Sequence, residues 1–266
     1  MLRDITIGQY YPANSVVHRL DPRVKLFSVL LFVISLFISQ NIAGFLGVTV
    51  FLVFFITLSR VPFRYMVKGL KAILIILLIT ALFNLFLTPG EILVKFWIFS
   101  ISREGVVSAA KMAVRLVYLI LGTFVVTLST TPNALTDGLE KALRPLKVIR
   151  VPVHEIAMMM SIALRFIPIL VEEADKIMKA QIARGADFES GNLFKRAKNM
   201  VPLLVPLFIS AFRRANDLAL AMEARCYHGG EGRTKMKPLK YRGRDVAAYV
   251  IVFVYFAAIV LLRIFL

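Results

Sequence analysis

The chain has 266 residues, of which 59% are hydrophobic, and a formal net charge of +17 at pH 7. Soluble domains are about 45–50% apolar, and the excess here forms long uncharged runs that are typical of membrane spans. The basic charge does not indicate nucleic-acid binding, because Lys and Arg gather between these runs, as they do on the cytoplasmic side of membrane proteins. A single cysteine, Cys226, excludes an internal disulfide, and the three separated histidines suggest no metal site.

The uncharged runs predict five transmembrane helices. The first run, 26–59, has 34 residues. As one helix it would be about 51 Å long, against a hydrocarbon core of about 30 Å. We therefore expect two short helices with a break near Gly44, after a polar N-terminus that does not read as a signal peptide. The five expected spans are about 25–40, 43–59, 70–89, 106–131 and 246–266.

The distribution of Lys and Arg predicts the orientation of these spans. The N-terminal tail carries four of them, the turn near 40–44 none, the segment 60–71 four, and residues 233–244 six. Cytoplasmic loops are enriched in Lys and Arg. We therefore expect the N-terminus and residues 132–245 on the cytoplasmic side of the membrane and the C-terminus outside.

Residues 132–245 differ from the rest of the chain, with 20 Lys and Arg against 12 Asp and Glu. Their longest apolar stretch has 14 residues, a length more typical of buried or interfacial helices than of spans. We predict three cytoplasmic helices here, of which the second and third begin apolar, end charged and stop at glycine breaks. Their expected bounds are about 133–147, 153–184 and 192–227.

Small residues recur at every fourth position in both long helices. Such spacing lets two helix backbones approach closely, which would make the pair cross as one rigid unit. Alanine is also simply a good helix former, so the sequence leaves both interpretations open. The residues are Ala157 and Ser161 in the second helix and Ala211, Ala215 and Ala219 in the third.

These elements together predict an all-α membrane protein. We expect about five transmembrane helices plus a cytoplasmic coupling domain of about three helices, two of them long and crossing. Residues 1–131 would form an N-terminal membrane domain with four spans, residues 132–245 the coupling domain, and residues 246–266 the last transmembrane helix.

The same Ala-Arg-small triplet ends both long helices, as Ala183-Arg184-Gly185 and Ala224-Arg225-Cys226. A cation in the last turn complements the helix macrodipole, which explains either arginine taken alone. The repetition favours a second interpretation. Two planar guanidinium groups at the cytoplasmic tips of two helices suit bidentate contacts with carboxylates or backbone carbonyls of a partner protein.

Three stretches carry a resemblance to a known family: His18–Leu26 before the first span, Ala183–Gly185, and Arg213–Arg225. They resemble the transmembrane coupling subunit of energy-coupling factor transporters, the EcfT family, which is close to the CbiQ subunits of cobalt and nickel uptake. The layout of four spans, a helical cytoplasmic insert and a last span also matches. The resemblance thus covers essentially the whole chain.

The resemblance implies a non-catalytic subunit without a cofactor in the inner membrane of a bacterial or archaeal cell. In the family the two arginine motifs dock in grooves of two ABC-type ATPase subunits. It also implies a separate substrate-binding membrane protein, the S component, for a vitamin or a transition-metal ion. The implied ATPase-docking residues are Ala183, Arg184, Gly185, Ala224, Arg225 and Cys226, the last standing where the family often has glycine.

Other function classes fit the residues less well. The chain has no G-x-x-x-x-G-K-[ST] loop, so we expect ATP hydrolysis to come from a partner. A self-contained secondary permease, the main alternative, would usually carry acidic residues at mid-membrane, and four of the five expected spans contain none. A membrane enzyme acting on lipid or prenyl substrates would need paired carboxylates near a span, and no such pair is seen.

Three basic residues lie inside or beside apolar segments. Lys111 and Arg115 are one helical turn apart, and intramembrane charges are candidates for function. We favour snorkelling toward the membrane surface for these two. Arg165 needs a carboxylate or carbonyl partner if buried, or lipid headgroups if interfacial, and the sequence does not decide between them.

Overall fold

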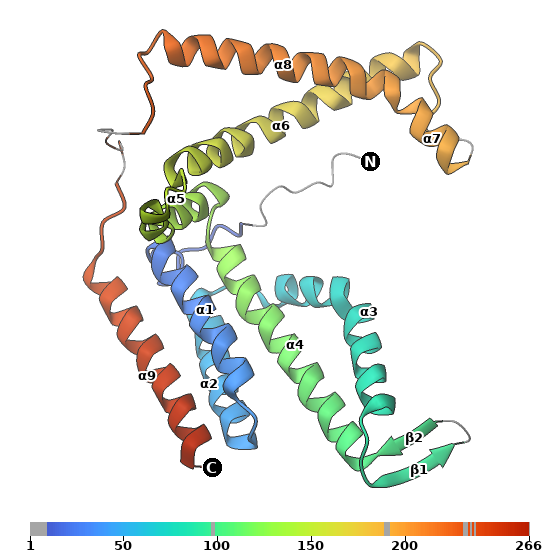
Figure 1. The fold of residues 1–266 in the computed structure, drawn as a ribbon, viewed down its shortest axis with the longest axis vertical. Coiled ribbons are helices and arrows are strands. Elements are labelled where there is room, and N and C mark those ends of the chain that lie inside the picture. The colour runs from blue at the N-terminus through green and yellow to red at the C-terminus, as the bar shows by residue number, and fades with distance from the viewer. Residues whose placement is uncertain are drawn as a thin grey trace. The chain divides into compact units, whose positions relative to one another are not determined.

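A computed structural model describes residues 10–96, 99–188, 192–230, 234, 236 and 238–265 of the chain (Figure 1). The regular elements of these residues are helices apart from one short β-hairpin, which confirms the predicted all-α class. The chain divides into a core unit, Gly8–Leu139 with Leu239–Leu266, and an arm unit, Glu140–Pro238. The elements are α1 (Pro22–Ile38), α2 (Ile42–Ser59), α3 (Phe63–Leu87), β1 (Ile92–Phe96), β2 (Phe99–Ser102), α4 (Arg103–Ser129), α5 (Pro132–Ala142), the 3₁₀ helix η2 (Arg144–Ile149), α6 (Val153–Ala183), α7 (Leu193–Asn199), α8 (Val201–Glu223) and α9 (Gly243–Phe265).

Four of the described helices, α2, α4, α6 and α9, are long and apolar enough to cross a membrane. α3 adds a fifth if its two parts, Phe63–Lys71 and Ile73–Leu87, which meet at 59°, form one broken span. α1 is slightly shorter, with 17 residues, and rises about 26 Å. α6 qualifies through its apolar first part, whereas residues 171–183 carry five charges. The chain is therefore a multi-pass membrane protein.

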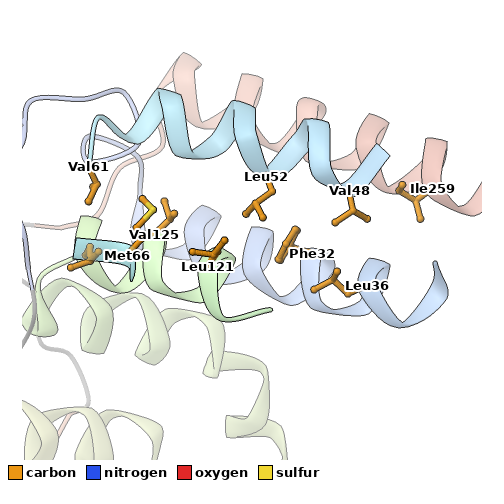
Figure 2. Packing of buried hydrophobic residues seen from close by; sticks show 10 residues of the cluster. Phe32, Leu36, Val48, Leu52, Val61, Met66, Leu121, Val125 and Ile259 are labelled. Carbon is orange, nitrogen blue, oxygen red and sulfur yellow. The ribbon is translucent and has the colours of Figure 1, made fainter. Parts of the chain in front are cut away.

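One apolar cluster, shared by α1, α2, α3, α4 and α9, holds the core unit together (Figure 2). Phe32 and Leu36 of α1 are one helical turn apart, which places both on the face that packs inward. Gly122 of α4 admits the Phe32 ring, because a Cβ at this position would lie 2.3 Å from a ring carbon. The cluster is Phe32, Leu36, Val48, Leu52, Val61, Met66, Leu121, Val125, Leu128 and Ile259.

Buried charges tie the N-terminal end of α1 to two other helix ends. Lys25 donates from Nζ to the carbonyl of Ser129, the last residue of α4, at 2.8 Å. Asp21, the N-cap of α1, donates its N–H to Oδ1 of Asp245 in the first turn of α9, at 2.9 Å. Lys25, Asp21 and Asp245 are 3%, 7% and 1% exposed. The polar stretch His18–Leu26 thus has a structural role in joining three helices.

Three basic side chains converge on the C-terminal end of α1. The contacts are Lys111 Nζ to Gln40 O, Arg115 Nη2 to Ser39 O and Arg263 Nη1 to Ile38 O, each at 3.1 Å. The last carbonyls of a helix lack intrahelical partners and carry the negative end of its dipole. Arg263 therefore caps the last carbonyl of α1, whereas Lys111 and Arg115, for which snorkelling was expected, bind the two carbonyls that follow it. Arg165 is exposed on α6.

Three elements differ from the sequence-based expectation. The single helix expected over 192–227 forms two helices, α7 and α8, because the ring of Pro202 in the first turn of α8 cannot follow a continuous helix. The helix expected over 133–147 ends at Ala142 and continues as 3₁₀ turns. The loop before α4 forms an antiparallel hairpin, β1–β2, for which no alternating pattern was recognised.

Candidate docking ends of the two long helices

The two long helices of the arm unit, α6 and α8, cross in antiparallel directions (Figure 1). Ser210 on α8 donates from Oγ to Glu173 on α6 at 2.7 Å, and Arg214 donates to the same carboxylate. Nearer the end of α6, Gln181 donates to the carbonyl of Pro202 at 3.3 Å. Residue numbers therefore rise along one helix as they fall along the other, and Glu173 is the polar centre of the crossing.

Hydrogen bonds from Ser210 and Arg214 hold the pKa of Glu173 below its ordinary value of 4.5. A carboxylate with a lowered pKa stabilises the fold above its ordinary pKa, and this contribution is lost as the pH falls through the lowered value. We therefore expect thermal stability in detergent to fall below about pH 4.5 more steeply for the wild type than for Glu173→Gln. If the melting temperatures of the two proteins fall equally with pH across this range, the proposed contribution of Glu173 is wrong.

Both long helices end in the same hydrogen-bonded turn. At the end of α6, Gly185 N–H donates to Ile182 O (2.9 Å) and the following N–H reaches Gln181 O (2.9 Å). At the end of α8, Cys226 N–H donates to Glu223 O (2.9 Å) and the following N–H reaches Met222 O (3.1 Å). This pair of bonds is the Schellman motif, which needs one residue with positive φ. In each case the residue just before the positive-φ position is arginine, Arg184 or Arg225.

The positive-φ positions are Gly185, with φ +87°, and Cys226, with φ +54°. Glycine takes this conformation freely, whereas an L-residue with a Cβ is strained by about 1–2 kcal/mol. We expect Cys226→Gly to slow hydrogen exchange of the Tyr227 amide by about fivefold, and Gly185→Ala to speed exchange of the Ala186 amide by about the same factor. Unchanged exchange in both variants would show that neither position limits the stability of its helix end.

The six predicted docking residues are all exposed. Within the described part of the chain, the guanidinium groups of Arg184 and Arg225 make no hydrogen bond or ion pair, so both remain available. From the crossing at Glu173 and Ser210, Arg184 lies 11 residues along α6 and Arg225 lies 15 residues along α8. At 1.5 Å per residue, and in opposite directions, the two tips are up to about 39 Å apart.

The small residues predicted for the crossing do not form its polar centre. Ala157 is buried, but Ser161 is exposed and bonds to the carbonyl of Ala157 within its own helix at 3.0 Å. Ala211 is half-buried, whereas Ala215 and Ala219 are exposed. The crossing instead uses the neighbouring face of α8, because this face carries the donors that satisfy Glu173.

Sequence reasoning missed Glu173, Ser210 and Arg214 as crossing residues. Ser210 and Arg214 are four positions apart and so share a face of α8, opposite an acidic residue on α6. Complementary polar groups on two long amphipathic helices were the signal that could have found them.

The two long helices also expose large apolar side chains in the arm unit. On α8, Phe208 and Phe212 are 67% and 59% exposed, and their rings lie 5.1 Å apart. On α6, Met159 is 58% exposed. An exposed apolar patch such as the Phe208–Phe212 pair marks contacts with a protein or a membrane. Among the described residues, no group of three or more His, Cys, Asp and Glu side chains could hold a metal ion.

Comparison with known proteins places these features in a family. The family model CbiQ, described as cobalt transport protein, matches residues 13–236. A protein of Clostridium kluyveri is 58% identical over 93% of both chains, and one of Thermosediminibacter oceani is 52% identical over 94% of both. A protein of Bacillus subtilis is 49% identical over 99% of this chain and 100% of its own. All three are named energy-coupling factor transporter transmembrane protein EcfT. The chain therefore belongs to the CbiQ/EcfT family of energy-coupling factor transporter transmembrane proteins.

Proposed function

We propose that the chain is the transmembrane coupling component of an ABC-type uptake transporter of the energy-coupling factor class. It transmits ATP-driven motion from two ATPase subunits, which hydrolyse the ATP, to a substrate-binding membrane S component that takes up a vitamin or a transition-metal ion. The observation that carries this proposal is the pair of identical helix ends, each presenting an exposed arginine without a partner in the described chain.

Each tip binds one ATPase subunit. A Schellman turn fixes the direction of the last helical turn, so Arg184 and Arg225 are presented on rigid supports rather than on loops. Their planar guanidinium groups suit bidentate contact with carboxylates or carbonyls in a groove. A separation of up to about 39 Å, derived from the helical rise, suits two separate subunits better than one groove. The N-terminus and the arm unit face the cytoplasm, where ATP is available.

The crossing converts movement of the tips into movement of the arm unit. Glu173 holds α6 and α8 together at one point, so both helices act as levers about that point. When the ATPase subunits close on ATP, their grooves carry the two arginines closer together. The angle between α6 and α8 then changes, and the exposed apolar side chains on both helices move with it.

The S component covers the exposed apolar surface of α6 and α8. Phe208 and Phe212 are too exposed to be part of the folding core of the chain on its own. A membrane protein that binds the substrate offers a matching apolar surface. A change in the crossing angle then reorients or releases this partner, which couples ATP hydrolysis to uptake.

Cross-linking from the two tips tests this function. Cys226 is the single cysteine and is exposed, so a thiol-to-amine reagent can link the wild-type chain at the second tip. A Cys226→Ser, Gly185→Cys variant moves the reagent to the first tip. With the cell's ATPase subunits co-expressed, we expect each protein to capture one ATPase chain, and the Gly185→Cys single variant, which has both thiols, to capture two.

Met236→Cys in the Cys226→Ser background provides the control, because Met236 is fully exposed in the arm unit but lies on neither helix tip. It should capture little ATPase. Equal capture from Met236 would mean random collision and would count against docking at the tips. Capture of no ATPase by any variant would contradict the coupling function, and the chain alone in liposomes should then be assayed for transport as a permease.

A further inference from the structure

A short segment of the arm unit combines exposed cations with exposed aliphatic side chains. η2, Arg144–Ile149, ends where Arg150 adopts φ +62°. None of the η2 residues is buried, and Val148 and Ile149 are 89% and 71% exposed. Removing such exposed aliphatic side chains from water is favourable, and this requires another surface to cover them.

The order of residues in this segment matches the geometry of the 3₁₀ helix. A 3₁₀ helix has three residues per turn, so side chains at positions i and i+3 lie on one line. Arg144 and Lys147 therefore share one face. Leu146 and Ile149 share a second face, and Val148 lies on the third. The segment is amphipathic at a period of three, with a cationic face beside apolar faces.

The cations border a surface hollow of about 920 Å³ in the arm unit. Lys141, Arg144, Lys147 and Arg150, again at a spacing of three, all line it. Among the described residues, the side chains of these four make no hydrogen bond or ion pair. The acidic lining residues are Glu155 and Glu140, and Glu140 is hydrogen-bonded to His154 at 3.1 Å. The hollow therefore has an excess of positive charge that is open to an anion.

We propose that η2 is a binding site for anionic phospholipid, with the headgroup phosphate held by the cationic face and Val148 and Ile149 lying in the acyl boundary. Short segments with basic residues on one face and aliphatic residues on another bind membranes by this combination. Arg144 follows Ser129, the end of α4, by only 15 positions, and α5 between them rises about 16 Å. The short connection allows this segment to reach the surface of a bilayer that α4 spans.

An acidic segment of a partner protein is the competing occupant of the cationic face. Such a partner would explain the cations but leave the aliphatic side chains without a reason for their exposure. Val148 and Ile149 are largely exposed and do not line the hollow, so they do not form part of a groove that could receive a helix or a strand. A bilayer accounts for both kinds of side chain together.

The test uses the full chain alone in liposomes, so its result is independent of ATPase docking. A fluorescent label is placed at Val148→Cys in a Cys226→Ser background, and the vesicles contain phosphatidylglycerol or phosphatidylcholine with bromine atoms near the top of the acyl chain. Bromine quenches the label only at contact. We expect clear quenching in phosphatidylglycerol and protection of the label from iodide in the water.

Charge variants show whether the headgroup is recognised. Arg144→Gln with Lys147→Gln removes two exposed cations from η2, and attraction to the anionic surface should weaken by about 30-fold. Lys195→Gln with Arg196→Gln on α7 makes the same charge change at exposed positions of the same unit and should leave quenching unchanged. Both variants change exposed side chains, and gel filtration in detergent verifies that they remain folded.

Three results would overturn the proposal. Ready quenching by iodide with no effect of brominated lipid would place Val148 in water. Equal quenching in both lipids, unaffected by the η2 charges, would mean apolar contact without recognition of an anionic headgroup. Protection from iodide only after the ATPase subunits are added would assign the cationic face to a partner protein.

Discussion

The chain carrying both Arg184→Glu and Arg225→Glu is expected to retain no ATPase subunits after purification in detergent, whereas the wild type retains them. Truncating a central interface arginine typically costs about 2–4 kcal/mol, and a reversed charge adds repulsion from the carboxylates that the arginine was facing. Each single variant should still hold one subunit through its other tip, so it should retain a reduced amount of ATPase per chain. Co-expression with the ATPase subunits, followed by measurement of their amount per chain, checks this result.

The matched control for the double variant is Arg196→Glu with Lys198→Glu. It makes the same change in charge at exposed positions of α7, in the same unit but on neither tip. It should retain as much ATPase as the wild type. Equal loss in the control would mean that overall charge, rather than the two tips, governs association. Full retention by the double variant would remove Arg184 and Arg225 from the interface.

The two arginine ends could be found from sequence because several local signals coincide there. Arg184 precedes a glycine at the end of a charged helical stretch, and the triplet recurs around Arg225. Helix ends depend on neighbouring residues, so such signals are readable along one stretch of chain. That Cys226 would adopt positive φ was not readable, since residues with a Cβ seldom do so. The positive φ of Cys226 is seen only in the folded turn.

The crossing of α6 and α8 could not be placed from sequence, because it depends on the register between segments far apart in the chain. Small residues at a spacing of four drew attention to Ala215 and Ala219, which are exposed. The helices instead meet where Glu173 faces Ser210 and Arg214, on the adjoining face. Spacing within one helix identifies its possible faces but does not say which face meets the partner.

Charge counting likewise assigned Lys25 only to the cytoplasmic side of the membrane. That rule treats every lysine as solvated. In the structure Lys25 is 3% exposed, because its position one turn into α1 is also where α4 ends. The carbonyls at the end of α4 need donors, and Lys25 supplies them. Its role follows from the contact between two helices whose sequences lie about a hundred residues apart.

Lys25→Met is expected to destabilise the core unit more than substitution of any exposed lysine. The methionine matches the lysine in length but removes the donors to Ser129 O (2.8 Å), Thr130 Oγ1 (3.2 Å) and His18 O (3.3 Å). Each buried polar group left without a partner costs about 1–3 kcal/mol. We expect a total of about 3–5 kcal/mol, which lowers the unfolding midpoint in detergent by about 10 °C. Static light scattering during heating measures this midpoint.

Asp245→Asn tests the same junction from α9. Asp245 accepts N–H donors with both oxygens, from Asp21 at 2.9 Å and from Arg242 at 2.7 Å. Asparagine has only one acceptor oxygen, so one N–H would face an NH₂ group instead, and the midpoint should fall by several degrees. Lys147→Met and Asp217→Asn are the matched controls. Both side chains are exposed, so these substitutions should change the unfolding midpoint little. If Lys25→Met unfolds at the same temperature as Lys147→Met, the buried charges do not hold the three helix ends together. The stretch His18–Leu26 would then need another explanation.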